Sequence, residues 1–211
     1  MALRRGGGNG GSDGASGRRI LIIVGHPDPN PSRFCRALAD AYADGAERFG
    51  HSVRRIDIAM LEFPLLRTLE EFEHASVPEV LRLSAEAIVW SEHIVLVFPL
   101  WLGTMPAMLK GWLEQVLRPG TAFAYPDQAG SLARSLLGGR SARIVVTMGM
   151  PGMVYRLWFR NHGLAGMRRN ILNFVGIAPV RETVFGMVAG GNDMKRKGWL
   201  EQMRRLGAAG T

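Results

Sequence analysis

Short runs of apolar, largely β-branched residues alternate along the chain with longer stretches of helical periodicity. Strands are predicted at residues 20–24, 53–58, 93–98, 141–148 and 179–185. The first, third and fourth runs are almost continuously apolar, which is typical of parallel strands buried on both faces. Helices are predicted at residues 33–49, 78–90, 106–118, 164–174 and 193–206. Residues 59–77 are less regular, and residues 150–161 are expected to form a loop rich in proline and aromatic residues.

Strands that alternate with helices are the signature of βαβ units. The pattern therefore predicts one α/β domain with a doubly wound parallel sheet of five strands. Ligands of such sheets bind outside the carboxyl ends of the strands, near the switch point. The loops after the first, third and fourth strands are accordingly expected to carry the chemistry.

The first of these loops, residues 25–32, reads Gly-His-Pro-Asp-Pro-Asn-Pro-Ser. It contains neither GxGxxG nor GxxxxGK[ST], which disfavours the two common nucleotide-binding loops. The loop leads into a helix N-terminus, where backbone N–H groups and the helix dipole favour a phosphate. Ser32 is expected either to cap the helix or to donate to an anion, and Arg33 to add charge. His26 can equally be a hydrogen-bonded loop residue without a ligand.

The second loop, residues 99–106, combines two prolines, a tryptophan and a glycine with no charged side chain. A rigid apolar shelf of this kind suits one face of a planar aromatic ligand, with backbone N–H groups left for its polar edge. The alternative is an apolar loop that a neighbouring subunit covers. The two interpretations are compatible.

A family resemblance follows from this region. Residues 98–125 read FPLWLGTMPAMLKGWLEQVLRPGTAFAY and resemble the NAD(P)H:quinone oxidoreductase family. That family includes modulator-of-drug-activity type reductases and ancillary subunits of potassium/proton antiporters. Gly25-His26-Pro27 with Ser32, and the turn Thr147-Met148-Gly149, extend the resemblance to nearly the whole chain after residue 19. The resemblance implies a flavodoxin-like sheet of order 2-1-3-4-5, a bound flavin, and two-electron reduction of quinones or related electrophiles by NADH or NADPH.

The resemblance also implies which residues form the flavin site. The family's first loop, represented by His26, Ser32 and Phe34, binds the phosphate end of the flavin. The second loop lies along the isoalloxazine, and its residues here are Pro99, Leu100, Trp101, Leu102 and Gly103. Thr147 and Gly149 belong to the turn that faces the pyrimidine edge.

Three further residues are candidates for the reaction itself. Tyr155 and His162 fall near the places where some family members have a tyrosine and a histidine beside the flavin, and both are predicted to be catalytic. Ordinary loop packing is the alternative for each. Tyr125 matches an aromatic residue that reaches the substrate pocket of the neighbouring subunit, which implies a homodimer.

The third loop departs from the family pattern. The usual Thr-Thr-Gly-Gly turn reads Thr147-Met148-Gly149-Met150, and residues 155–160 are aromatic and basic where the family has a Gly/Ser-rich loop. Hydride at flavin N5 leaves negative charge near N1 and O2, so hydrogen-bond donors are needed at the pyrimidine edge. The backbone N–H groups near Gly149 can supply them.

Composition and charge narrow the class of protein. The 211-residue chain is 47% hydrophobic and 21% charged, as expected for a globular protein without a membrane span. The formal net charge of +8 lies largely near the chain ends, with no nucleic-acid module, so a solvated basic surface that attracts anionic ligands is expected. Residues 1–18 contain seven glycines and are predicted to be a disordered extension of a domain at 19–211.

Cysteine and histidine usage gives no sign of a disulfide or a metal site. Cys35 is the only cysteine, which fits a reducing, cytoplasmic location, and it is predicted to be a buried structural thiol. His51, His74 and His93 lack a second ligand at metal spacing and are interpreted as structural or solvated.

The sequence therefore predicts a flavin-dependent NAD(P)H oxidoreductase that reduces quinones. FAD is slightly favoured, because the first loop lacks the run of hydroxyls seen in FMN-binding flavodoxins, and FMN stays open. The expected partners are a small-molecule acceptor and a second copy of the chain, with no nucleic acid and no membrane insertion. The alternatives are an ancillary subunit of an antiporter and a flavodoxin-type electron carrier.

Overall fold

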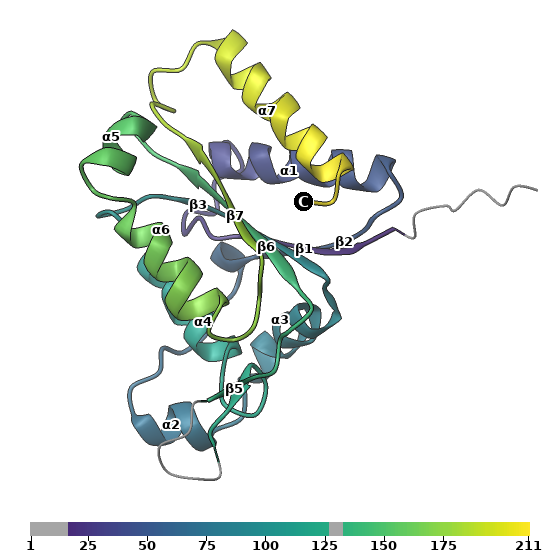
Figure 1. Cartoon of the computed structure of the whole chain (residues 1–211), viewed down its shortest axis with the longest axis vertical. Helices are drawn as coiled ribbons and strands as arrows, with labels where there is room; N and C mark the ends of the chain where they lie inside the picture. Colours follow the sequence, from purple (N-terminus) through teal and green to yellow (C-terminus); the bar gives the residue numbers. More distant parts are fainter. Residues whose placement is uncertain (1–16, 127–132) are drawn as a thin grey trace, which may run out of the picture.

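A parallel sheet forms the centre of the described part of the chain, residues 17–126 and 133–211 of a computed structural model (Figure 1). Its strands are β1 (Arg19–Val24), β2 (Ser52–Asp57), β3 (His93–Pro99), β6 (Ser141–Thr147) and β7 (Val180–Phe185). The five strands are parallel and follow the order β2-β1-β3-β6-β7. The predicted flavodoxin-like order 2-1-3-4-5 is thereby confirmed. The switch point lies where β1 and β3 part toward opposite edges.

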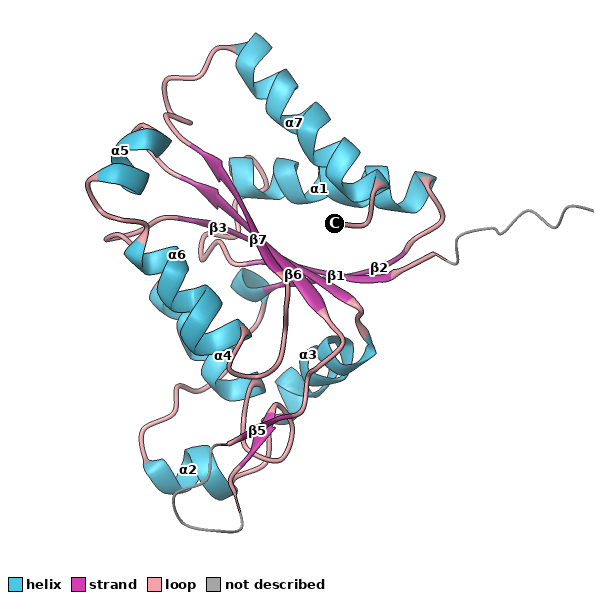
Figure 2. Cartoon of the chain, viewed as in Figure 1, coloured by secondary structure: helices cyan, strands magenta, loops and turns pink. Residues whose placement is uncertain are grey.

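Helices cover both faces of the sheet (Figures 1 and 2). One face carries α1 (Phe34–Arg48) and α7 (Asp193–Ala208). The other face carries α3 (Glu79–Trp90), α4 (Ala107–Val116), α6 (His162–Gly166) and the π-helical segment η2 (Met167–Leu172). Each face has its own buried apolar core, and every residue of the central strand β3 is buried. Helices therefore cover both faces of the sheet, and a functional site can form only where the strands begin or where they end.

Helices α1 and α7 approach each other at backbone distance. A Cβ added at Gly45 would lie 2.0 Å from the carbonyl oxygen of Arg204, and one added at Gly207 would lie 2.0 Å from that of Tyr42. Only glycine fits at these two positions. The contact fixes α7 against the helix that follows the first loop.

The structure differs from the sequence prediction in the connecting segments. Residues 150–161 were expected to be a loop, which is wrong, because α5 (Gly152–Leu157) occupies their centre. The irregular stretch 59–77 contains the last residues of η1 (Ile58–Met60) and all of α2 (Leu69–His74). A short antiparallel pair, β4 (Phe123–Ala124) and β5 (Arg134–Ser135), was not predicted. These elements are too short to show a periodicity in the sequence.

The extension predicted at residues 1–18 lies outside the described residues, except for Gly17 and Arg18, which lead directly into β1. No helix among the described residues combines the length and the apolar character needed to cross a membrane.

Candidate functional site

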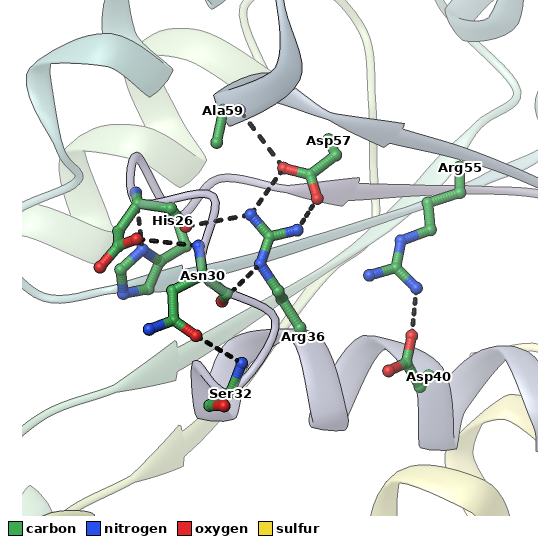
Figure 3. Close-up of polar contacts among 9 residues, drawn as sticks. His26, Asn30, Ser32, Arg36, Asp40, Arg55, Asp57 and Ala59 are labelled. Carbon is green, nitrogen blue, oxygen red and sulfur yellow. Dashed lines mark hydrogen bonds and ion pairs between the residues drawn. The ribbon is translucent and has the colours of Figure 1, made fainter.

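The loop after β1 is held by its own side chains (Figure 3). The backbone N–H of Asn30 donates to Asp28 Oδ1 at 2.8 Å, and that of Ser32 donates to Asn30 Oδ1 at 2.9 Å. The N–H of Asp28 donates to His26 Nδ1 at 3.0 Å. Since Nδ1 accepts, the neutral imidazole carries its proton on Nε2. Burial, together with the nearby Arg33 guanidinium, lowers the pKa of His26, which favours this neutral form.

Arg36 ties the first loop to the sheet, and sequence reasoning missed it. Its guanidinium donates to the carbonyl oxygens of Asn30 at 3.1 Å and Asp28 at 3.0 Å. It also forms an ion pair with Asp57 at the end of β2, in which Nη2 lies 3.1 Å from Oδ1 (Figure 3). The one available signal was a basic residue next to Cys35 on a helix whose inner face is apolar. The charged side chain of Arg36 can be buried because it is paired, and it supplies donors to loop carbonyls that would otherwise be unpaired.

The amino end of α1 is open to an anion. Arg33 occupies the N-cap position, and no side chain of the described residues caps the helix. Ser32 is exposed and does not act as the cap, so the capping alternative for this residue does not hold. The Arg33 guanidinium lies 2.6 Å from Asp28 Oδ2, and Phe34 packs on Trp199 of α7 with ring centroids 5.8 Å apart. Uncapped N–H groups at a helix start are a ready phosphate site.

A tight turn forms the shelf after β3. The N–H of Trp101 donates to the carbonyl oxygen of Thr104 at 2.9 Å, and the N–H of Thr104 donates back at 3.1 Å. Both central residues have positive φ, 47° at Leu102 and 81° at Gly103, as in a type I′ turn. The left-handed conformation is costly for leucine. Because the Leu102 side chain is fully exposed and Trp101 is 48% exposed, the turn presents apolar surface outward.

Contacts across the strand ends bring the three loops together. The His26 and Trp101 rings pack in a T-shaped arrangement with centroids 6.1 Å apart, and the N–H of Leu100 donates to the carbonyl oxygen of Thr147 at 2.8 Å. The Thr147 hydroxyl itself is buried and lies 3.3 Å from Cys35 Sγ, so it faces α1. The three loops thus form one continuous edge, as the sequence predicted.

The turn after β6 leaves its backbone accessible at one residue. Gly149 is exposed, and a Cβ added there would meet nothing within 4 Å. Met148 is buried, and its N–H donates to the carbonyl oxygen of Phe185 at 2.9 Å, while the carbonyl oxygen of Met150 accepts from Met187 at 3.1 Å. The two methionines therefore anchor the turn to the end of β7, and Gly149 stands free between them.

Tyr155 lies on α5 and is buried. Its hydroxyl donates to the carbonyl oxygen of Gly103 at 3.0 Å, so its proton is directed at the shelf turn. Burial raises the pKa of this phenol. The contact gives Tyr155 a role that the prediction did not include, which is holding Gly103 in place.

His162 is exposed at the first position of α6. The next residue, Gly163, lies so close to the shelf turn that an added Cβ would be 2.1 Å from the carbonyl oxygen of Gly103. The histidine is therefore carried beside the shelf by a backbone contact, with its side chain on the surface.

Tyr125 lies away from the shelf of its own chain. The shelf precedes α4 and Tyr125 follows it, and ten residues of helix span roughly 15 Å. Tyr125 packs on Phe123 at a ring-centroid distance of 5.5 Å and lines a pocket of about 320 Å³ with Lys110 and Phe174. The structure thus does not bring Tyr125 together with the other predicted site residues within one chain.

The described residues contain no cluster of three or more histidine, cysteine or acidic side chains that could hold a metal ion. The site is built instead from an uncapped helix end, an apolar shelf and free backbone groups. With the parallel sheet of order β2-β1-β3-β6-β7, these loops define a flavodoxin-like α/β domain.

Comparison with known proteins gives the family. A family model described as a flavodoxin-like fold, Flavodoxin_2, matches residues 18–206. The chain is 30% identical over 185 residues to a Haemophilus influenzae protein described as an uncharacterized NAD(P)H oxidoreductase, with 86% of this chain and 90% of that protein covered. The chain belongs to the NAD(P)H:quinone oxidoreductase family with the flavodoxin-like fold.

Two further matches support this assignment. An FMN-dependent NADH:quinone oxidoreductase of Beijerinckia indica is 27% identical, with 78% of this chain and 85% of that protein covered. The solved structure of an NAD(P)H:quinone oxidoreductase from Methanothermobacter marburgensis superposes with a TM-score of 0.73 at 24% identity, covering 93% of this chain and all of that one. The second match shows the shared fold.

Proposed function

We propose that this protein is a flavin-dependent NAD(P)H oxidoreductase that reduces quinones or related electrophiles by two-electron hydride transfer. The observation that carries the proposal is the juxtaposition of an uncapped helix N-terminus with an exposed apolar shelf, joined by the contact between His26 and Trp101. The first feature suits the phosphate of a flavin and the second suits its ring. The names of the relatives support the same activity.

The residues present fit a flavin. The N–H groups at the start of α1 would bind its phosphate, and the Trp101–Thr104 turn would lie along one face of its ring. Gly149 would offer backbone donors to the pyrimidine edge, because nothing covers it. The flavin supplies the hydride chemistry, and the protein positions it and stabilises the charge that develops on it.

We favour FMN over FAD as the flavin. Relatives from Beijerinckia indica and a Jannaschia strain are described as FMN-dependent NADH:quinone oxidoreductases. A Bacillus anthracis azoreductase solved with FMN has the same fold, with a TM-score of 0.69 at 15% identity. The absence of consecutive hydroxyls in the first loop argued for FAD, but uncapped helix N–H groups can bind a phosphate without hydroxyls.

We further propose that a second copy of the chain completes the substrate pocket. Tyr125 stands at the far end of α4 from its own shelf and is half exposed, so it can meet a shelf only on a partner. The shelf side also exposes large apolar side chains, among them Leu102, Leu157 and Trp158. Exposed apolar groups of this size mark an interface or a ligand site.

The experiment that tests the function is to purify the full chain and identify its bound flavin by absorbance and mass. Bound FMN, with oxidation of NADH or NADPH by a quinone, is the expected result. Protein that is colourless and takes up neither FMN nor FAD would contradict the proposal. Analytical ultracentrifugation of the same sample tests the dimer, and a monomer that is fully active would exclude the role of Tyr125.

The relatives named above are described as oxidoreductases. Their names favour an enzyme over an antiporter subunit or an electron carrier. No feature of the described residues favours either alternative, so neither is proposed.

A further inference from the structure

The opposite edge of the sheet, where the strands begin, holds a second pocket of about 270 Å³. Its walls come from the start of β3, β6 and β7 and from the residue that precedes β1. A seven-residue strand is roughly 23 Å long, so this pocket is separate from the flavin loops at the other ends of the same strands. The lining residues are Arg18, His93, Gly139, Arg140, Ser141, Ala142, Ala178, Pro179, Arg181 and Thr211.

His93 is the first sign of a ligand. It is 1% exposed and lines the pocket, yet its Nε2 has no hydrogen-bond partner among the described residues. Its Nδ1 lies 2.8 Å from Ser141 Oγ, which also accepts from Arg18 Nη2 at 3.2 Å. Because Arg18 can only donate, the Ser141 hydroxyl is free to donate to Nδ1, and Nε2 then carries the proton.

The protonation state of His93 agrees with this assignment. Burial, together with the nearby guanidinium groups of Arg18, Arg143 and Arg181, lowers the pKa of His93 to about 3. The ring is therefore neutral at ordinary pH. The buried N–H of Nε2 has no acceptor among the described residues, which is rare in native structures.

The arginines are the second sign. Three of the lining residues are arginine, and none of the described residues that line the pocket has an acidic side chain. The carbonyl oxygen of Thr211, which also lines the pocket, accepts from Arg143 Nε at 2.7 Å. Arg18 and Arg140 are held in position by backbone carbonyls, with Arg18 Nη1 at 2.8 Å from the oxygen of Gly210 and Arg140 Nη2 at 2.6 Å from that of Val89. Arg181 is exposed, and none of the ion pairs within 4 Å among the described residues involves any of the three. The Glu92 carboxylate, whose pKa is lowered by the Arg19 backbone N–H and by the charges of Arg19 and Arg18, lies, among the three, in the neighbourhood of Arg18 alone. Three arginines around neutral donors form an oxyanion site.

We propose that this pocket binds a phosphoryl group, either free or carried by a small molecule. Arg18, Arg140 and Arg181 surround the anion, and the buried His93 ring and the Ser141 hydroxyl form part of the pocket wall beside it. The site uses side chains that the proposed flavin site does not, so the inference stands independently of the flavin.

Calorimetric titration with inorganic phosphate tests the proposal. The full chain is titrated at low ionic strength both as purified and after addition of excess FMN, which occupies the helix start of α1 where it binds. We expect one saturable site per chain. Arg181→Gln should weaken phosphate at least about tenfold, the loss expected for one charge-assisted hydrogen bond. Arg67→Gln is the matched control, because Arg67 is an exposed arginine beside α2, outside the pocket.

A second readout locates the anion at the imidazole. The ring signals of His93, assigned by their loss in His93→Gln, should shift on phosphate addition in the native chain and stay unshifted in Arg18→Gln. Titration with AMP separates the two sources: tighter binding than inorganic phosphate shows a ligand-borne phosphoryl group, and equal or weaker binding shows the free anion. Absence of saturable binding by either, or equal weakening in Arg181→Gln and Arg67→Gln, would overturn the proposal.

Discussion

The carboxyl ends of the strands (the carboxyl edge) and their amino ends (the amino edge) differ in how their polar groups are paired. At the carboxyl edge the first loop satisfies its own polar groups through Asp28, Asn30 and Arg36, and the shelf beside it exposes tryptophan and leucine. At the amino edge three arginines line a pocket with no acidic side chain among its described residues, and the Nε2 of His93 is unpaired. The carboxyl edge is held in place by its own hydrogen bonds and exposes apolar surface. The amino edge is polar and carries an excess of positive charge. The same parallel sheet therefore offers a planar ligand one end and an anion the other.

At the carboxyl edge, the loop conformation rests on a few contacts from side chains to backbone groups, and the loss of one such contact should move a loop. At the amino edge, the buried and charged groups should make the free energy of unfolding depend on pH.

The largest effect is expected from Arg36→Met. The change leaves Asp57 and the carbonyl oxygens of Asp28 and Asn30 without their buried partner, which should cost about 3–5 kcal/mol of unfolding free energy. Urea denaturation measures the loss, and flavin affinity should fall with it because the first loop is released. Arg55→Met is the control, since the exposed pair of Arg55 with Asp40 (Figure 3) should contribute less than about 1 kcal/mol. Equal losses in the two variants would show that Arg36 does not hold the loop.

The next effect concerns the approach of α6 to the shelf turn. Gly163→Ala puts a Cβ 2.1 Å from the carbonyl oxygen of Gly103, so the turn must shift, at about 1–3 kcal/mol. The dissociation constant of the flavin, measured by fluorescence titration, should rise about tenfold. Gly166→Ala on the same helix meets nothing within 4 Å and should be neutral or slightly stabilising. Unchanged flavin affinity in Gly163→Ala would mean that the shelf turn does not contact the flavin.

Because His93 is buried at the amino edge, we expect the free energy of unfolding to depend on pH. The pKa of His93 is about 3 in the folded chain and near 6.5 when unfolded, so below pH 6.5 only the unfolded chain takes up the proton. Stability is therefore lost as pH falls, by about 1 kcal/mol between pH 6 and pH 5 from this residue alone. Urea denaturation at the two pH values should show this part of the loss in the native chain and not in His93→Gln. The same pH dependence in both would contradict a buried neutral His93.

The smallest expected effect is that of Tyr155→Phe, which distinguishes a positioning role of Tyr155 from a catalytic one. Removing its hydrogen bond to Gly103 in Tyr155→Phe should cost about 0.5–1 kcal/mol and weaken flavin binding a few-fold. A general acid would instead lower kcat by about a hundredfold or more and change the pH profile. Steady-state kinetics of Tyr155→Phe beside His162→Gln measures the difference. If neither variant alters turnover, the catalytic hypothesis for both residues is wrong.

Much of the fold followed from the sequence because β1, β3 and β6 are apolar runs that only a doubly covered sheet can bury. The five predicted strands lie within one or two residues of the observed ones, and Pro106 indeed precedes α4. Helix α5 could not be foreseen, because Gly152 and the aromatic residues around Tyr155 have weak helix propensity. Its conformation depends on the tertiary contact between Tyr155 and the shelf.

The parts of the site that consist of backbone could be predicted from the sequence. The prediction failed where the site depends on the direction of a side chain. The loops at Gly25, Trp101 and Gly149 do meet at one edge, as the order of elements required. The roles of Arg36 and Tyr155 depend on which carbonyl each side chain reaches across the fold. Spacing along the chain carries no information about such contacts.

The glycine contact between α1 and α7 has a consequence for how the protein is made. Helix α1, whose amino end we assign to the flavin phosphate, packs on the sheet and on α7, and the second of these contacts waits for residues 193–208. On the ribosome, the nascent chain holds the first loop and the shelf long before α7 leaves the exit tunnel. The helix that leads from the first loop is therefore covered on its outer side only after α7 has been synthesised.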